Sequence, residues 1–491
     1  MSSQPSTEES AIAGASEPAE GASESRRSLS ARHIVFFVIA AAAPLGFAVG
    51  STPLSIGRGG IGTAGVFLIA GLFLSIFAVG YVAMTKYIPN AGALFSYISA
   101  GLGRPLGIGV AFVAVISYAL ISVGSIGPFA VFAEFTVQSL LGVAIPWPVW
   151  GILGVVLMGV LGQLNVELNM RVLGFFMIAE VLVLAVLGIS IMVQGGAEGL
   201  SLDALNPGAI AQGQLGVVLL VVFAAFAGFE ATALFRDEAK NPVRTLRRAT
   251  FGSIAVIALL QAFVAWAIVQ AFGSMAGDVA LNNPTEMFTG AAETFVGGWF
   301  ATLISILVVF SWFASVLAFH NATTRYLHAL ARDGVIPAMF TKRSKRTNAP
   351  WVASLVHSVL ALAAIVMCII AGLDPYLDLF VLGSVPVAVA VPAMECLTAL
   401  AIFVFFWKNR RGHSVWTVAV APAIATVVLG AVVSLVLANM SFYTGQEGAI
   451  NWILPAINLV VLCIGFARAM WMRRNSPERY AMIGRRGLTD D

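Results

Sequence analysis

The sequence predicts an all-α polytopic membrane protein with twelve transmembrane helices. Hydrophobic residues make up 59% of its 491 residues and charged residues only 10%, whereas a soluble fold of this length needs far more surface charge. Twelve apolar runs are long enough to cross a bilayer, which takes about 20 mostly apolar residues. The basic residues between these runs fall almost entirely on alternate loops, as expected for a chain that crosses a membrane repeatedly.

The expected helices are numbered 1 to 12 in chain order. They cover residues 34–56, 62–87, 107–138, 147–164, 172–193, 214–236, 249–272, 298–322, 351–372, 377–407, 415–437 and 452–472.

The distribution of Lys and Arg predicts the orientation of these helices. If the amino terminus is cytoplasmic, 26 of the 27 Lys and Arg residues lie on the cytoplasmic side and only Arg58 lies outside. Cytoplasmic loops carry such an excess, and an error of one helix would scatter it. We therefore expect a multi-pass protein of the plasma (cytoplasmic) membrane with both termini in the cytoplasm.

The two ends of the chain are predicted to be tails. Residues 1–30 are rich in Ser, Ala and Glu and cannot bury a core, so they are expected to form a disordered cytoplasmic tail. This stretch is acidic where a signal peptide would be basic. Residues 473–491 are expected to form a second cytoplasmic tail. The outer connections 194–213 and 273–297 are expected to be ordinary exposed loops.

The cysteine pattern indicates neither a disulfide framework nor a zinc site, because Cys368, Cys396 and Cys463 all lie inside apolar segments. No cofactor, metal or nucleic-acid partner is expected.

Two of the expected helices are predicted to be interrupted. Pro44 and Gly46 lie near the middle of helix 1, where Pro removes an N–H donor and Gly permits unusual backbone. Gly228 is a similar weak point in helix 6, five helices later. Paired interruptions at this spacing indicate an inverted-repeat transporter, because an odd number of crossings inverts the second set. A proline kink and a packing glycine are the alternatives. Pro386 and Pro392 predict a bend in helix 10.

Three motifs resemble the amino acid/polyamine/organocation permeases. Gly-Phe-Glu-Ala-Thr-Ala followed by Asp-Glu-Ala-Lys-Asn-Pro, within 228–242, resembles the signature of that family's sixth helix. Residues 325–337, Arg-Tyr-Leu-His-Ala-Leu-Ala-Arg-Asp-Gly-Val-Ile-Pro, are similar to the segment after its eighth helix. Residues 89–104 resemble the loop between helices 2 and 3. The matches occur in the expected order within about 34–472.

The resemblance implies a leucine-transporter-like fold of two inverted five-helix repeats. The repeats would be 31–195 and 214–409, with helices 11 and 12 in 410–472. It also implies a central site between helices 1, 3, 6, 8 and 10. The substrate-binding residues carried over are Ala43, Pro44, Leu45 and Gly46 in helix 1, and Ala225, Phe226, Ala227 and Gly228 in helix 6.

This chain departs from the family at two places in that site. Many members have Gly-Ser-Gly in helix 1 where this chain has Pro-Leu-Gly. Many relatives also have an aromatic residue just before the helix 6 interruption, where Ala224 and Ala225 stand here. Phe223 or Phe226 is the candidate to replace that aromatic as a gate over the substrate.

Four acids lie within the expected helices: Glu134, Glu180, Glu230 and Glu395. A charged acid facing lipid at the membrane centre costs about 2.5–3.5 kcal/mol on insertion scales, so each is expected to face the interior or to be protonated.

Glu180 and Glu230 are the candidates for proton coupling. Some relatives place a lysine in helix 5 where a sodium ion would bind, so Glu180 is a departure. As a hypothesis it carries the proton, because burial favours the neutral acid; the alternative is a structural, hydrogen-bonded acid. Glu230 either receives protons linked to substrate release or supports the opened backbones of helices 1 and 6. Structural pairing is favoured for Glu395, and Glu134 is expected at the outer interface.

Helix 8 supplies further polar groups. Ser311 and Ser315 are four residues apart and share a face. They lie near the sodium site of relatives with this fold, although helix-packing hydroxyls are commoner than ion ligands. For His320 a buried imidazole bonded to a carbonyl is favoured over a pH-sensitive group. The basic stretches 240–248 and 342–346 could contact anionic lipid headgroups, but topology alone explains them.

The sequence therefore predicts a secondary active transporter of amino acids or related amines, driven by proton symport and not an enzyme. Free N–H groups of the second half of helix 1 would hold the carboxylate of the solute, and helix-end carbonyls its ammonium. An exchanger and a non-transporting solute sensor or channel are the alternatives. A major facilitator would have a longer central loop after helix 6 than this chain has.

Overall fold

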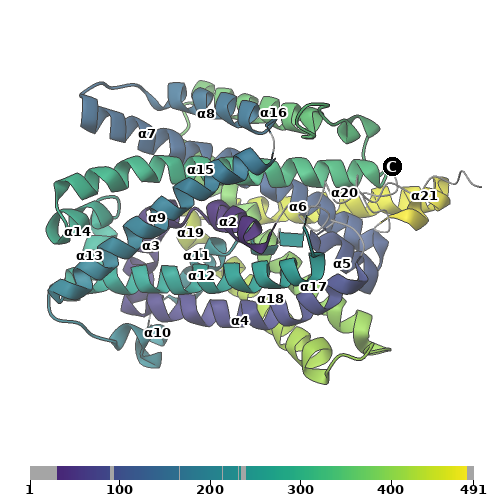
Figure 1. Cartoon of the computed structure of the whole chain (residues 1–491), viewed down its shortest axis with the longest axis horizontal. Helices are drawn as coiled ribbons and strands as arrows, with labels where there is room; N and C mark the ends of the chain where they lie inside the picture. The colour runs from purple at the N-terminus through teal and green to yellow at the C-terminus, as the bar shows by residue number, and fades with distance from the viewer. Residues whose placement is uncertain are drawn as a thin grey trace, which may run out of the picture.

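The computed structural model describes residues 30–88, 93–164, 166–212, 214–230, 232–233 and 239–483. All regular elements in these ranges are helices, and most run along the long axis of the molecule (Figure 1). Several expectations fall outside the described residues: the tail before Ser30, part of the loop motif within 89–104, Arg236, and the last eight positions.

The first half of the chain contains helices α2 to α11. They are α2 (Ala31–Ala42), α3 (Pro44–Gly59), α4 (Thr63–Met84), α5 (Ala93–Leu102), α6 (Arg104–Gly124), α7 (Ile126–Leu141), α8 (Trp147–Leu161), α9 (Val166–Gln194), α10 (Pro207–Gln212) and α11 (Leu215–Ala225).

The second half contains two π-helical segments, η7 and η8, among its α-helices. The elements are α12 (Pro242–Phe272), α13 (Ala276–Asn282), α14 (Met287–Phe295), α15 (Gly298–Arg332), α16 (Trp351–Ala371), η7 (Pro375–Leu382), α17 (Gly383–Trp407), η8 (Trp416–Val420), α18 (Ala421–Ala438), α19 (Met440–Thr444), α20 (Ile450–Asn475) and α21 (Pro477–Met482).

Nine helical stretches within the described residues are long and apolar enough to cross a membrane. The first, Ala31–Tyr87, is 57 residues long and contains both expected helices 1 and 2. Two shorter apolar helices, Trp147–Leu161 and Leu215–Ala225, occupy expected helices 4 and 6. Each expected span thus corresponds to a helix, whereas the count of twelve crossings stays a prediction.

The outer connections are more ordered than the sequence indicated. The stretch 273–297 contains α13 and α14, and 194–213 contains α10. Small residues and scattered polar groups made these segments read as loops, yet Met287, Phe288 and Ala291 in α14 are buried against the bundle. Tertiary burial, rather than local propensity, holds such short helices.

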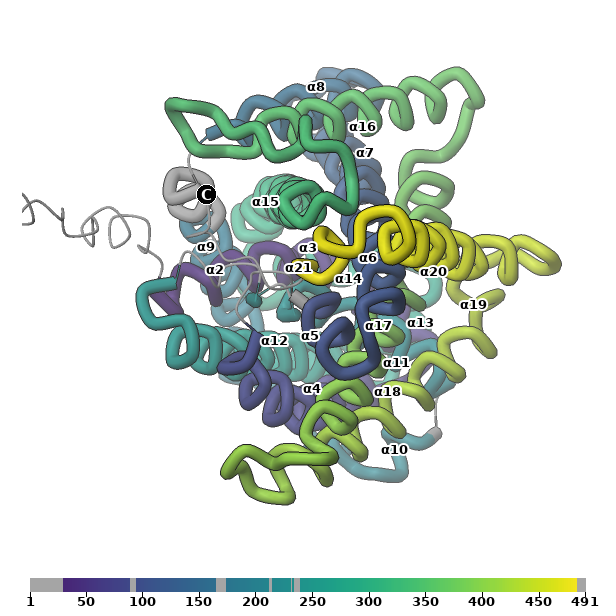
Figure 2. The backbone as a smooth tube through the Cα atoms, turned by 90° about the vertical axis from the view of Figure 1, so that its right-hand side faces the viewer, coloured from purple at the N-terminus to yellow at the C-terminus, as the bar shows by residue number. Residues whose placement is uncertain are grey.

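The helices form layers around a central group (Figure 2). Helices α8 and α16 lie side by side in an outer layer next to α15, while α4, α12 and α18 form the opposite side. Helix α20 packs on α6 at the periphery. Outer helices expose large apolar side chains, such as Val160 on α8, Leu360 on α16 and Leu459 on α20. An apolar exterior of this kind suits lipid, as in a multi-pass membrane protein.

Candidate functional site

The first interruption lies at Ala43, between α2 and α3. Ala43 has a left-handed backbone, with φ 44° and ψ 65°, which costs a non-glycine residue about 1–2 kcal/mol. Pro44 follows as the first residue of α3, and a residue before proline is disfavoured in the α conformation. The opening is thus one residue long, and Leu45 and Gly46 already belong to the first turn of α3.

The second interruption begins where α11 ends, at Ala225. The N–H groups of Phe226 and Ala227 donate to carbonyls only three residues back, each at 3.1 Å, which tightens the end of the helix. Gly228 then takes φ 105°, a conformation that favours glycine. The predicted weak point is therefore where the helix opens.

Glu230 supports this second interruption from within. Its Oε2 accepts the N–H of Gly228 at 2.9 Å, and its Oε1 accepts the hydroxyl of Tyr118 on α6. Its own carbonyl accepts the hydroxyl of Tyr81 on α4 at 2.9 Å. Glu230 is fully buried, so these bonds satisfy a backbone turn that no water reaches.

Glu395 lies close enough to Glu230 for the two acids to interact electrostatically, and it is buried. Within the described part of the chain its carboxyl group makes no hydrogen bond. Two buried acids at short range cannot both be ionised at low cost. The structural role favoured for Glu395 from the sequence stays a prediction.

Packed aromatic rings surround these acids. Tyr81 stacks on Tyr97 with 4.7 Å between ring centroids, and Tyr118 lies 5.5 Å from Tyr326. All four are buried. These rings pack together in the half of the bundle that the basic residues predict to be cytoplasmic.

Glu180 holds the start of α3. Its Oε2 accepts the N–H of Leu45 at 3.3 Å and the hydroxyl of Ser311 at 2.7 Å. The same serine oxygen accepts the N–H of Gly46 at 3.0 Å. The buried carboxylate of Glu180 on α9 thus contacts the amino terminus of α3 both directly and through the Ser311 hydroxyl. The amino terminus of a helix is a favourable place for an anion.

The carbonyl groups at the first interruption also have side-chain partners. Ser315 donates its hydroxyl to the carbonyl of Ala41 at 3.1 Å, and Gln261 on α12 donates to the carbonyl of Pro44 at 3.2 Å. Ser315 therefore lies at the end of α2 and Ser311 at the start of α3, on either side of the interruption.

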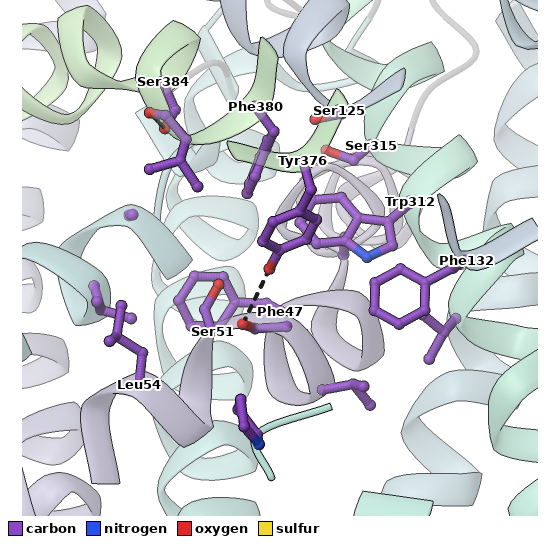
Figure 3. Close-up of a pocket in the computed structure, with 18 of the residues that line it drawn as sticks. Phe47, Ser51, Leu54, Ser125, Phe132, Trp312, Ser315, Tyr376, Phe380 and Ser384 are labelled. Atoms are coloured by element: carbon purple, nitrogen blue, oxygen red, sulfur yellow. Dashed lines mark hydrogen bonds between the residues drawn. The ribbon is translucent and has the colours of Figure 1, made fainter. Parts of the chain in front are cut away.

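A cavity of about 630 Å³ lies between the two interruptions (Figure 3). Its wall includes the end of α2 at Ala41–Ala43 and the end of α11 at Phe223, Ala224 and Ala227. Hydroxyl groups of Ser51, Ser125, Ser315 and Ser384 are among the polar groups of a lining that also contains many apolar side chains. Arg58 and Glu286 are the charged side chains among the described lining residues.

The cavity extends toward one end of the bundle. Its lining includes 284–286 between α13 and α14 and 442–445 after α18, both on the side predicted to be external. The connection 273–297 therefore contributes to the cavity, whereas the sequence gave it no such role.

Aromatic side chains from α15 and η7 form one wall. The ring of Phe380 lies 4.9 Å from that of Trp312 and 5.7 Å from that of Tyr376. The hydroxyl of Tyr376 donates across the cavity to the carbonyl of Gly50 at 3.3 Å (Figure 3). Single-turn π segments often occur at functional sites. Sequence reasoning missed Tyr376 and Phe380, although Asp374-Pro375 at a helix start was a visible signal.

Comparison with known proteins identifies the family. Residues 29–467 match the amino acid permease family. The chain belongs to that family.

Individual relatives are distant. A branched-chain amino acid permease of Bacillus subtilis is 24% identical over 59% of this chain and 63% of its own length. An uncharacterized transporter of Mycobacterium tuberculosis is 26% identical over 62% of this chain and 67% of its own length. An L-lysine transport protein of Corynebacterium glutamicum is 22% identical over 69% of this chain and 68% of its own. This permease thus spans somewhat less than two thirds of the Bacillus relative.

The permease places the predicted site residues in two groups. Ala43, Phe223, Ala227 and Ser315 line the cavity. The others are not among its described lining residues: Pro44, Leu45, Gly46, Ala225, Phe226, Gly228, Ser311, Glu180 and Glu230. Of the two gate candidates, Phe223 faces the cavity, while Phe226 is buried in the main core.

His320 has a different partner from the carbonyl expected. Its Nε2 lies 2.9 Å from the hydroxyl oxygen of Ser354, and its Nδ1 lies 2.9 Å from Nδ1 of His357. Both imidazoles are buried between α15 and α16. His320 does not line the cavity. The pair joins two helices of the permease, and neither imidazole is among the described residues that line the cavity.

Proposed function

We propose that this permease is a secondary active transporter of an amino acid or a related amine, working by alternating access with proton symport. One observation carries the proposal: a cavity at the two helix interruptions reaches one end of the bundle, and its described lining does not include the packed tyrosines. Alternating access requires such a one-sided opening around a central site.

The proposal includes the architecture expected from the sequence. The chain would cross the plasma membrane twelve times, with repeats at 31–195 and 214–409, helices 11 and 12 in 410–472, and cytoplasmic termini. Interruptions in the first helix of each repeat support this arrangement. In this orientation the cavity is open to the outside.

The ammonium group of the solute would bind at the carbonyl ends of α2 and α11. Both helix ends line the cavity, and carbonyl ends of helices carry partial negative charge. These carbonyl groups would offset the cost of removing the ammonium group from water, so no carboxylate is needed at the helix ends. Ala43 and Ala227 are the residues nearest these ends that we expect the solute to touch.

The side chain of the solute is proposed to be uncharged. The relatives' names include both branched-chain amino acids and L-lysine. The described wall of this cavity contains Phe47, Phe132, Phe380 and other apolar groups, and its only charged members are Arg58 and Glu286. A cationic side chain would lack a buried counter-ion at the centre of this site.

Glu180 and Glu230 are the two candidates for the proton carrier, and lipid would surround the bundle. Ser311 and Ser315 would form an ion site only if sodium replaced the proton. Their present partners are Glu180, Gly46 and Ala41, which supports the proton alternative.

Uptake into proteoliposomes tests the function. Under an inward pH gradient, the purified permease should concentrate at least one radiolabelled solute from a panel of neutral amino acids and their amines. Collapse of the gradient with a protonophore should abolish accumulation. A thermal-shift screen would first select solutes, because a ligand that binds only the folded state stabilises it.

The alternatives give different results in the same vesicles. An exchanger would take up label only when unlabelled solute is inside, regardless of the pH gradient. A sensor would bind solute in the thermal-shift screen without any uptake. Absence of binding across the whole panel would contradict the proposed function itself.

A further inference from the structure

The amino terminus of α3 already holds a carboxylate that belongs to the protein. Leu45 N–H bonds directly to Glu180 at 3.3 Å, and Gly46 N–H reaches it through Ser311. These are the backbone donors that the sequence assigned to the carboxylate of the solute. In this structure they are occupied.

The other positions of this turn offer no backbone donor. Pro44 has no N–H group, and Phe47 donates its N–H to the carbonyl of Ala43 at 2.7 Å. A solute carboxylate therefore finds every backbone donor at the start of α3 taken. It can bind there only if it replaces Glu180.

A donor without a partner lies beside the same turn. The indole nitrogen Nε1 of Trp312 is buried and makes no hydrogen bond in the described structure. It lies 3.2 Å from the position that a Cβ atom would take on Gly46. Trp312 is only 4% exposed, yet it belongs to the cavity wall. A buried N–H without an acceptor is costly, so it indicates a ligand that accepts there.

We propose that Glu180 is an internal occupant of the turn at the start of α3, where it takes the place of the solute carboxylate, and that the indole N–H of Trp312 is a further donor to that carboxylate. The solute carboxylate takes the N–H groups of Leu45 and Gly46 and the indole N–H, and Glu180 withdraws. Two ionised carboxylates cannot share so small a buried site. Glu180 therefore withdraws with a proton taken from the side to which the cavity opens.

The cycle closes when the solute leaves on the other side. Glu180 then loses its proton to that side and returns to Leu45 and Ser311. One proton thus moves with one solute. This inference rests on the proposed function, since it requires a solute with a carboxylate.

Among the described residues, no other acid or base contacts Glu180. Helix α9 packs against α2, α3, α12, α14 and α15. The titratable side chains on these helices that are nearest in sequence to the site are Arg32, His33, Arg58, Arg248, Glu293 and His320. None of them acts electrostatically on Glu180, whose described polar partners are Ser311 and Leu45.

Paired ligands test the exchange. L-Leucine and L-phenylalanine would be compared with isoamylamine and phenethylamine, which have the same side chains without the carboxylate. For wild type, amino acid affinity should fall about tenfold per pH unit once Glu180 ionises in the empty site, as one linked proton requires. Affinity for the amines should not change with pH, because Glu180 can stay in place.

Glu180→Ala should remove the pH dependence of amino acid binding and leave amine binding unchanged. Glu180→Gln should also bind amino acids independently of pH. Because glutamine keeps the shape of the side chain and an acceptor for the N–H of Leu45, this variant controls for misfolding of the alanine variant. Glu134→Gln is the matched control, because Glu134 caps α8 through the N–H of Trp147 at 2.8 Å and lies away from the cavity wall. It should keep the wild-type profile.

Calorimetry in buffers with different ionisation enthalpies gives a second readout. Wild type should take up about one proton per amino acid bound, and both Glu180 variants none. If wild type binds amino acids and Glu180→Gln binds them with the same pH dependence, this inference is overturned while the proposed function stands. If no amino acid binds wild type, the proposed function fails and the inference fails with it.

Discussion

Substitution of Glu230 should separate backbone support from proton transfer. The carboxyl group accepts two hydrogen bonds, from Gly228 N–H at 2.9 Å and from the Tyr118 hydroxyl. Glu230→Gln can keep both contacts, since the amide oxygen accepts from Gly228 and the amide nitrogen donates to Tyr118. Glu230→Ala loses both and leaves two buried donors without acceptors.

The magnitude follows from those two bonds. An unsatisfied buried group costs about 1–3 kcal/mol, so Glu230→Ala should lower the free energy of unfolding by about 2–6 kcal/mol. Hydrogen bonds within membrane proteins average only ~0.6 kcal/mol in double-mutant cycles, which sets a lower limit of about 1 kcal/mol. Glu230→Gln should cost no more than about 1 kcal/mol, from reorientation of the Tyr118 hydroxyl.

Unfolding in mixed detergent micelles would measure stability, and uptake between acidic and neutral pH would measure coupling. If Glu230 is a support, the glutamine variant keeps both stability and the pH profile. A glutamine variant as unstable as the alanine variant would refute the reasoning from hydrogen bonds. A stable glutamine variant that has lost its pH dependence would make Glu230 the proton carrier.

Three further changes have defined outcomes. Gly228→Ala should cost about 1–3 kcal/mol of folding stability, because φ is 105°. Tyr376→Phe should weaken solute binding about two- to fivefold, since it removes one long hydrogen bond to Gly50. Hydrogen bonds from Ser274 lower the pKa of the Glu198 carboxyl from its usual 4.5. That loop contact is therefore complete above the usual pKa and is lost as the pH falls through the lowered value, which amide exchange at Ser274 would detect.

Each of these changes has a control. Gly290→Ala, at a helical glycine with open space beside it, should not destabilise the protein and should raise its stability by up to about 1 kcal/mol. A loss of binding well beyond tenfold in Tyr376→Phe would mean that the hydroxyl contacts the solute itself. In Glu198→Ala the Ser274 amide should exchange without protection at every pH, and an acid transition that persists in its protection factor would contradict the assignment.

Much of the fold could be predicted because membrane insertion imposes a simple pattern. Length and hydropathy located a helix for each expected span, and Pro44 marked the first interruption to within one residue. The residue before a proline avoids the α conformation, so Ala43 could have been identified as the opened position. Gly228 marked the second interruption, because only glycine adopts its positive φ without strain.

The site could be predicted only in part, because it depends on how each helix is rotated about its axis and on which residues its side chains contact. Periodicity says that Glu180 lies on a helix, but not that it faces a turn 135 residues earlier in the chain. The aromatic wall from η7 was missed because a π-helical segment shifts which side chains share a face. The cavity contribution of 273–297 was missed because burial by neighbours is invisible in a short amphipathic stretch.

A buried acid bonds to the backbone at each of the two interruptions, but the geometry gives these two acids different roles. Glu230 bonds to Gly228, two residues away in the same turn, so its departure would open the turn that it belongs to. Glu180 comes from another helix, and its direct bond to Leu45 is 3.3 Å long. It can leave by a side-chain rotation while the backbone of α3 stays helical, because the solute carboxylate replaces it on the same donors. A group that must bind and release a proton in each cycle has to be able to leave. We therefore assign proton transfer to Glu180 and backbone support to Glu230.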